Sequence, residues 1–156
     1  MLSKSFIVLI IAMGISLHTT ACCTTKQAIT SSALPAAIAP YSQAILSTAT
    51  SGDQTLYMSG ILPMRPSKEL VDDPTQATTL VMDHITALLN EASMNWSSVV
   101  DVLILVRDIN DFKAISDSYG VYLQSQGVTI LPVRACFQAG KLPLNAVVEI
   151  KAMAVK

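Results

Sequence analysis

The sequence predicts one α+β domain, in which a mixed sheet carries two helices on one of its faces. Two stretches repeat apolar residues at helical spacing, and the other apolar runs are short and rich in β-branched residues, as strands are. A chain of 156 residues is long enough for one domain with a core and too short for two ordinary ones. The expected element order is ββαβαββ, over residues 35–156.

The composition is apolar and nearly neutral. Hydrophobic residues make up 51% of the chain, charged residues only 13%, and the mean hydropathy is +0.50. A small domain has little interior for this excess, so we expect apolar surface to be buried between subunits. The formal charge of −1 and the lack of a basic run exclude binding to a phosphate backbone, so no nucleic-acid partner is expected.

The N-terminus has the pattern of an export signal. Lys4 supplies a positive charge, and residues 6–17 form an uncharged apolar run that is too short to span a bilayer permanently. Small residues follow at 19–21. Residues 1–21 are therefore expected to be a signal peptide that delivers the protein to the periplasm.

Two kinds of signal fit, and a buried apolar helix is a weaker alternative. The first kind is a lipoprotein signal, in which Cys22 would be lipidated and would attach the protein to the membrane. Such signals usually carry leucine where this chain has Thr19, so an ordinary secretory signal cut near Ala21 stays open. Residues 22–34 lack an apolar period and are interpreted as a tether that precedes the domain at 35–156.

The domain is expected to open with a hairpin. The turn residues Ser51-Gly52-Asp53 separate strand-like runs at 44–49 and 54–59. A further short strand is expected at 61–64, where flanking prolines stop it.

The first helix is expected at Pro74–Ser93. Proline suits the first helical position, and Asp72 or Asp73 can cap it. The apolar stripe of this helix includes His84, which we expect to be a hydrogen-bonded residue at the core boundary. Because the only other histidine lies in the leader, a histidine-rich metal site is excluded for the mature protein.

The second half of the chain continues this alternation. Val99–Arg107 predicts a central strand covered on both faces, and residues 112–125 predict a helix that Gly127 ends. Two strands complete the domain, at 131–138 and 146–155.

Four polar features could form a site. On its strand, Arg134 shares a face with Cys136, and a guanidinium among apolar neighbours needs an anionic partner, either a carboxylate of the protein or one of a ligand. Glu149 lies on the following strand, which is expected to form a hairpin with the Arg134 strand, so the two side chains could face each other. Tyr41 stands at the entrance of the domain. At Ser59-Gly60, where a strand ends, backbone N–H groups can point at an anion.

Several segments resemble the RidA (YjgF) family of reactive-intermediate deaminases, in family order and near family spacing. They are Pro40-Tyr41-Ser42-Gln43, Ser59-Gly60-Ile61-Leu62-Pro63, Val106-Arg107-Asp108-Ile109-Asn110-Asp111-Phe112, Pro132-Val133-Arg134-Ala135-Cys136 and Val148-Glu149-Ile150-Lys151-Ala152. The resemblance covers about residues 34–156. It implies a chorismate-mutase-like fold, a homotrimer whose sheets form a central barrel, and active clefts between subunits.

The resemblance also implies an activity, the hydrolysis of reactive 2-imino acids and their enamines, such as 2-iminobutanoate and 2-iminopropanoate, to 2-oxo acids and ammonia. It implies no metal or organic cofactor. The chemistry of the residues agrees: Arg134 can hold a carboxylate through two parallel hydrogen bonds, and Glu149 can orient a water or move a proton. Tyr41, Ser59 and Gly60, expected from the neighbouring subunit, would help to bind the substrate, as would the backbone around Cys136.

Alternatives stay open for these residues. Glu149 could merely neutralise Arg134, and the Cys136 thiol is expected to be a small core hydrophobe, because no histidine is available to activate it. Ile61 departs from the family, which usually has glutamine there. A common family asparagine is either replaced by Ser116 or shifted in frame by a one-residue insertion near residues 128–131. A non-catalytic module that binds small carboxylates such as 2-oxo acids is the alternative function. An RNA-directed role, described for some relatives, conflicts with the negative charge.

Overall fold

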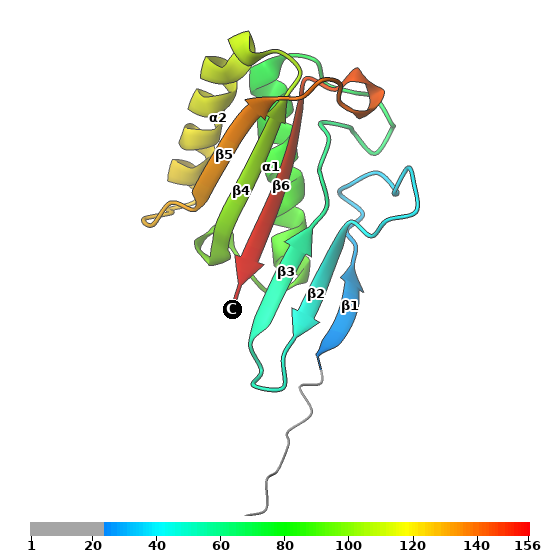
Figure 1. Cartoon of the computed structure of the whole chain (residues 1–156), viewed down its shortest axis with the longest axis vertical. Helices are drawn as coiled ribbons and strands as arrows, with labels where there is room; N and C mark the ends of the chain where they lie inside the picture. The colour runs from blue at the N-terminus through cyan, green and yellow to red at the C-terminus, as the bar shows by residue number, and fades with distance from the viewer. Residues whose placement is uncertain (1–23) are drawn as a thin grey trace, which may run out of the picture.

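The computed structural model describes residues 24–156 as an α+β domain, a six-stranded mixed sheet with two helices on one face (Figure 1). The predicted signal peptide at 1–21 and the predicted lipidation site Cys22 lie outside the described residues. The strands and helices follow the chain as β1 Thr25–Ile29, β2 Ala44–Thr48, β3 Gln54–Met58, α1 Pro74–Glu91, β4 Val99–Val106, α2 Phe112–Ser125, β5 Val133–Gln138 and β6 Val148–Val155.

Local sequence signals explain the helices. In α1, Pro74 occupies the first turn and the Asp73 carboxylate accepts a hydrogen bond of 2.9 Å from the backbone N–H of Gln76, as a helix cap should. The apolar stripe of α1 is fully buried against the sheet, and it includes Val81 and Ile85. The predicted helix positions are confirmed to within two residues.

The strand order is β1-β2-β3-β6-β4-β5, and β4–β5 is the only parallel pair among these strands. The expected hairpin of β5 with β6 is therefore wrong, because β4 lies between them (Figure 1). The physical reason is the α2 crossover. A helix between two strands returns the chain parallel to the first strand, so β5 pairs with the outer edge of β4. The last strand then fills the space between β3 and β4.

The tether predicted at 22–34 is also wrong in part, because Thr25–Ile29 forms strand β1 on the edge of the sheet. It pairs antiparallel with Ala44–Thr48. Only Ile29 of this strand is buried, so backbone hydrogen bonds rather than side-chain burial hold it in place. Sequence reasoning missed the strand because an exposed edge strand needs no apolar period.

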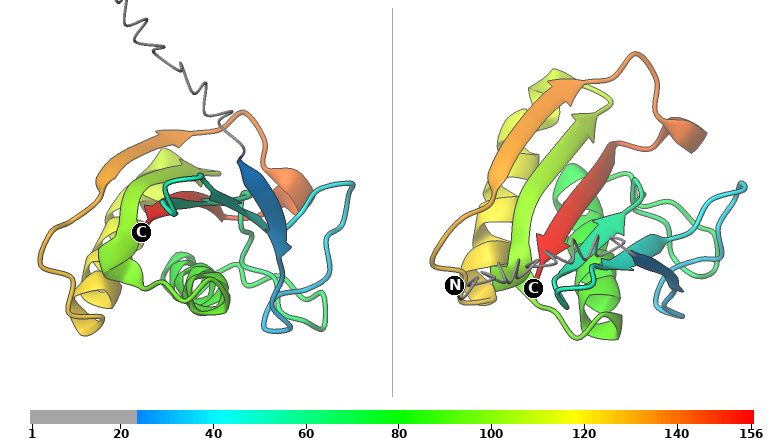
Figure 2. Two further views of the ribbon diagram at one scale, coloured as in Figure 1. Left: turned by 90° about the horizontal axis from the view of Figure 1, so that it is seen from below. Right: turned by 60° about the horizontal axis from the view of Figure 1, so that its bottom comes forward.

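The two faces of the sheet differ. Both helices lie under one face, and the sheet curves over them (Figure 2). On β4, Val102, Ile104 and Val106 point into this core and are fully buried, whereas Leu103 and Leu105 on the open face are only half-buried. The prediction that β4 is covered on both faces is therefore wrong for one chain.

The open face of the sheet carries large apolar side chains, together with the charged residues Glu149 and Lys151. Large side chains there remain 42–69% exposed, namely Tyr57, Val133, Phe137 and Val155. Among residues 24–156, no helix has the length and apolar character that a bilayer crossing requires.

Candidate active site

Four of the predicted site residues surround one hollow at the end of the sheet. Tyr41 precedes β2, Ser59 and Gly60 follow β3, and Glu149 lies in β6. Ile38, Ala39, Leu62 and Pro143 complete the lining. Residues far apart in the sequence meet here because β3 and β6 are neighbours in the sheet.

Gly60 allows Glu149 to lie directly against the backbone. A methyl group at this position would collide with Oε1 of Glu149 and would lie 2.7 Å from its Cδ atom. Glycine therefore leaves room for the carboxylate in this position, and a larger residue would displace the end of the Glu149 side chain.

Burial makes the Glu149 carboxyl group a weaker acid than an exposed glutamate. The half-buried carboxyl group has a raised pKa, because desolvation penalises its charged form. None of the ion pairs between described residues involves Glu149. A carboxyl group with a raised pKa beside an open hollow is suited to accepting and returning a proton.

Hydrogen bonds of Ser59 and Gln43 fix the chain segments on either side of Tyr41. The Ser59 hydroxyl donates to the carbonyl of Ser42 over 2.7 Å, which ties the segment beside Tyr41 to the end of β3. The buried Gln43 amide accepts from the backbone N–H of Ser31 at 2.8 Å and donates to the carbonyl of Pro35 at 3.0 Å. Sequence reasoning gave Gln43 no role; its place two residues after Tyr41, in a segment rich in small residues and proline, is the signal that could have pointed to it.

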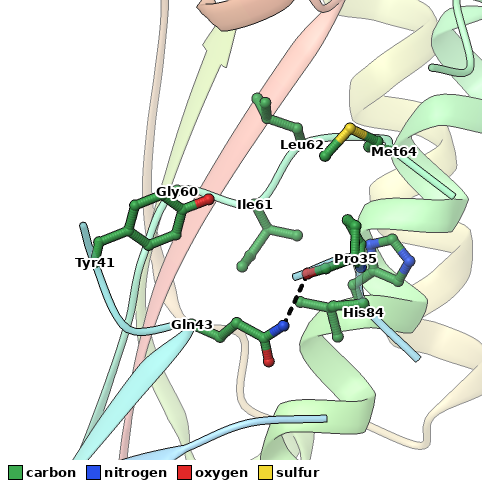
Figure 3. Close-up of a pocket in the computed structure, with 9 residues that line it drawn as sticks. Pro35, Tyr41, Gln43, Gly60, Ile61, Leu62, Met64 and His84 are labelled. Carbon is green, nitrogen blue, oxygen red and sulfur yellow. Dashed lines mark hydrogen bonds between the residues drawn. The ribbon is translucent and has the colours of Figure 1, made fainter. Parts of the chain in front are cut away.

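A small recess adjoins this hollow and shares Tyr41, Gly60 and Leu62 with it (Figure 3). Ile61 lines the recess, so the position that departs from the family lies beside the site. His84 lines it too.

His84 is not the boundary residue that the sequence predicted. It is only 2% exposed, and its Nδ1 atom has no hydrogen-bond partner among the described residues. Burial lowers the pKa of His84 and outweighs the opposite effects of Asp83 and of the Leu62 backbone.

Arg134 lies elsewhere, between β5 and helix α2. Its Nη1 donates to the Ser116 hydroxyl at 2.9 Å, and its guanidinium lies 5.7 Å from the ring centre of Phe112 and 5.3 Å from that of Tyr119. Within residues 24–156 no carboxylate forms an ion pair with it. Ser116, the candidate replacement for the family asparagine, therefore contacts Arg134, the residue predicted to bind the substrate carboxylate.

Arg134 and Glu149 do not face each other in one chain. Arg134 stands opposite Val102 of β4, whose side chain points toward the helices, and Glu149 stands opposite Leu105, on the open face. Because alternate residues of a strand point to opposite faces, the two charged groups lie on opposite sides of the sheet. The structure thus brings together Tyr41, Ser59, Gly60 and Glu149 in one chain, but not Arg134. The expectation that Tyr41, Ser59 and Gly60 reach Glu149 from a neighbouring subunit is therefore wrong, because β3 and β6 of the same chain are neighbours in the sheet.

Cys136 shares the helix-facing side of β5 with Arg134 and is half-buried against the core. Burial raises the pKa of its thiol, which favours the protonated, unreactive form. Cys136 does not line the hollow that contains Glu149. No group of three or more potential metal ligands (His, Cys, Asp or Glu) occurs within residues 24–156.

The fold is that of a group of small Rid proteins with solved structures. A putative translation initiation inhibitor from Vibrio vulnificus matches with a TM-score of 0.76 and 27% identity, over 83% of this chain and 99% of that one. The YjgF gene product and TdcF with bound serine, both from E. coli, each match with a TM-score of 0.75 and 27% identity, over 83% of this chain and 98% of theirs.

The chain belongs to the RidA (YjgF) family, whose model, described as Endoribonuclease L-PSP, matches residues 30–156. The goat protein named 2-iminobutanoate/2-iminopropanoate deaminase is 38% identical over 137 residues, which cover 84% of this chain and 90% of that protein. The human protein of the same name is 32% identical over 133 residues, with the same coverage.

Proposed function

We propose that this protein hydrolyses 2-imino acids to 2-oxo acids and ammonia, as the names of its mammalian relatives describe. The observation that carries the proposal is the guanidinium of Arg134, which is held by a hydroxyl and two rings and is not neutralised by any described carboxylate. A guanidinium with free donors fits the carboxylate that every 2-imino acid bears.

Hydrolysis then requires little more than positioning. With its carboxylate on Arg134, the substrate presents the C=N carbon to a water molecule that Glu149 orients. With the imine protonated on nitrogen, Glu149 takes a proton from the water as the water oxygen bonds to carbon, which gives a carbinolamine. Glu149 then returns that proton to the nitrogen, and the C–N bond breaks as ammonia leaves and the hydroxyl group becomes the carbonyl of the 2-oxo acid, releasing its own proton to solvent. The raised pKa of Glu149 suits both steps. Tyr41 and the backbone at Ser59-Gly60 line the substrate hollow.

The active site is completed by a second subunit in a homotrimer. Two features support this assembly. In one chain Arg134 and Glu149 lie on opposite faces of the sheet, so an Arg134 from a neighbouring subunit is needed beside Glu149. The open face also exposes large apolar side chains, among them Tyr57 and Phe137, which association would bury.

The test is the release of ammonia or 2-oxo acid from 2-iminopropanoate and 2-iminobutanoate, formed in situ by an amino-acid oxidase. We expect the protein to accelerate release and Arg134→Ala to abolish the acceleration. Arg65→Ala is the matched control, since Arg65 is an exposed arginine whose contact is a long ion pair with Glu69, at 3.9 Å. A wild-type rate equal to the uncatalysed rate would sink the proposal.

That result would favour the alternative function, a module that binds small carboxylates without turnover. Such a module keeps the Arg134 site and lacks a working Glu149. It would be recognised by thermal stabilisation with 2-oxobutanoate, lost in Arg134→Ala, in a protein that leaves imines unchanged.

We also propose that the protein is exported to the periplasm. The support is in the sequence: Lys4, the apolar run at 6–17 and the small residues before Cys22. Expression of the full chain in a bacterium, followed by mass determination of the mature product, tests this. A product that begins at Cys22 and gains acyl mass indicates a lipoprotein, cleavage near Ala21 without acylation indicates secretion, and an uncut chain excludes both.

A further inference from the structure

The surroundings of Arg134 come almost entirely from one face of helix α2. Phe112, Ser116 and Tyr119 follow each other at intervals of four and three residues, so their side chains lie along one helical stripe. Residues of this stripe reach the guanidinium through the Ser116 hydroxyl, at 2.9 Å, and through the two aromatic rings.

These contacts hold the cation without neutralising it. An aromatic face attracts a guanidinium but does not use its N–H donors in the way a carboxylate would. Of the five N–H groups of arginine, one is donated to Ser116. The remaining donors stay available for a ligand, while the long side chain has already lost much of its rotamer freedom.

Tyr119 can act on Arg134 through its ring and not through its hydroxyl group. It is only 6% exposed, and its hydroxyl group has no hydrogen-bond partner among the described residues. A buried hydroxyl without a partner destabilises a fold, so phenylalanine would be the better residue for stability. Burial also raises the pKa of Tyr119 to about 12, so the side chain stays neutral and cannot serve as a counter-ion. What remains is its electron-rich ring beneath Arg134.

We propose that Tyr119, assisted by Phe112, is a positioning residue that presents the Arg134 guanidinium to the carboxylate of the substrate. The inference rests on the proposed function for its substrate. A preorganised guanidinium binds more tightly, because less conformational freedom is lost when the carboxylate arrives. Loss of the Tyr119 ring should therefore weaken substrate binding equally in the ground state and in the transition state. The expected effect is a higher KM with little change in kcat.

The test replaces Tyr119 in the full-length protein and measures KM and kcat for 2-iminobutanoate. We expect Tyr119→Leu to raise KM about fivefold, the value of one exposed cation–π contact, with kcat nearly unchanged. Tyr119→Phe keeps a ring and should restore most of the binding, while the melting temperature stays equal or rises. Tyr122→Leu is the matched control, because Tyr122 is an aromatic residue of the same helix that contacts Trp96 instead.

A double-mutant cycle separates positioning from general damage. Because Arg134→Ala is expected to be inactive, the cycle uses Arg134→Lys, which keeps a charge but not the planar guanidinium that stacks on the ring. If Tyr119 acts through that guanidinium, Tyr119→Leu should change kcat/KM less in the Arg134→Lys background than in the wild type. The proposal is overturned if a folded Tyr119→Leu protein keeps the wild-type KM, if its effect is undiminished in Arg134→Lys, or if Tyr122→Leu raises KM equally.

Binding of 2-oxobutanoate, measured by calorimetry, distinguishes failure of this inference from failure of the proposed function. A protein that leaves imines unchanged but binds 2-oxobutanoate with the same dependence on Tyr119 refutes the deaminase and supports the positioning role. If the protein hydrolyses imines but neither its KM nor its affinity for 2-oxobutanoate changes in Tyr119→Leu, the deaminase function is supported and the positioning role of Tyr119 is refuted. A folded protein that neither turns over imines nor binds 2-oxobutanoate overturns both.

Discussion

Two inactive variants of this protein should regain activity when they are mixed. The first variant, Arg134→Ala, lacks the carboxylate anchor, and the second, Glu149→Gln, lacks the proton-transfer group. In one chain these groups lie on opposite faces of the sheet, opposite Val102 and Leu105 of β4. If each site combines Arg134 of one subunit with Glu149 of its neighbour, a mixed ring contains some intact sites.

The size of the recovery follows from the arrangement. A site is intact when the subunit that supplies Arg134 is of the second type and the neighbour that supplies Glu149 is of the first type. After random mixing in equal amounts, each condition holds for half of the sites. About one quarter of wild-type activity should therefore return, whatever the number of subunits in a closed ring.

The assay unfolds and refolds the variants together and measures 2-oxobutanoate release from 2-iminobutanoate. The controls are each variant refolded alone and the two mixed only after refolding. Recovery near one quarter, seen only after joint refolding, supports a site shared between subunits. If the jointly refolded mixture is as inactive as either variant, while wild-type subunits refold to full activity, the shared site is refuted.

Four further outcomes are expected. Glu149→Gln should lower kcat about 100-fold with a smaller change in KM. In the wild type the rate should fall as the pH drops through the pKa of Glu149, which burial raises above its usual range, and a flat pH profile would contradict the role of Glu149 as a base. Gly60→Ala should lower kcat in a protein that still folds, because the added methyl group displaces the Glu149 carboxylate; unchanged kcat would show that the carboxylate position is unimportant. Because burial lowers the pKa of His84, the unfolded chain binds a proton at this residue more readily than the folded chain does. The free energy of unfolding should therefore decrease as the pH falls below about 6.5, the ordinary pKa of histidine. Denaturant titrations at several pH values check this, and His84→Leu should make the free energy of unfolding less dependent on pH. Phe137→Asp, on the apolar open face, should shift sedimentation toward monomers and abolish turnover; an unchanged assembly would mean that the interface lies elsewhere.

Residues that act within one element were predictable from the sequence. The α1 helix was expected at 74–93 and is found at Pro74–Glu91, and α2 occupies the predicted 112–125. Helix caps and apolar stripes depend on residues a few positions apart, so the sequence contains them completely. Strand alternation likewise placed Arg134 and Cys136 on one face of β5, as observed.

The sequence also named the residues of the hollow, but it could not say which of them meet. Tyr41, Ser59, Gly60 and Glu149 come together because β6 pairs with β3, a contact between segments about one hundred residues apart. His84 was expected at the core boundary, and only the fold shows that the chain before β2 and the segment after β3 bury it.

The sequence by itself therefore determined the type of domain, its helices and most of its strands, and the segments that identify its family. The tertiary structure decided the strand order, the edge strand β1, and the separation of Arg134 from Glu149 by the thickness of the sheet. The reason is physical. Periodicity states which residues of a strand share a face, but the choice of neighbouring strand depends on the path of the whole chain, and one intervening strand is enough to move a predicted partner to the other side.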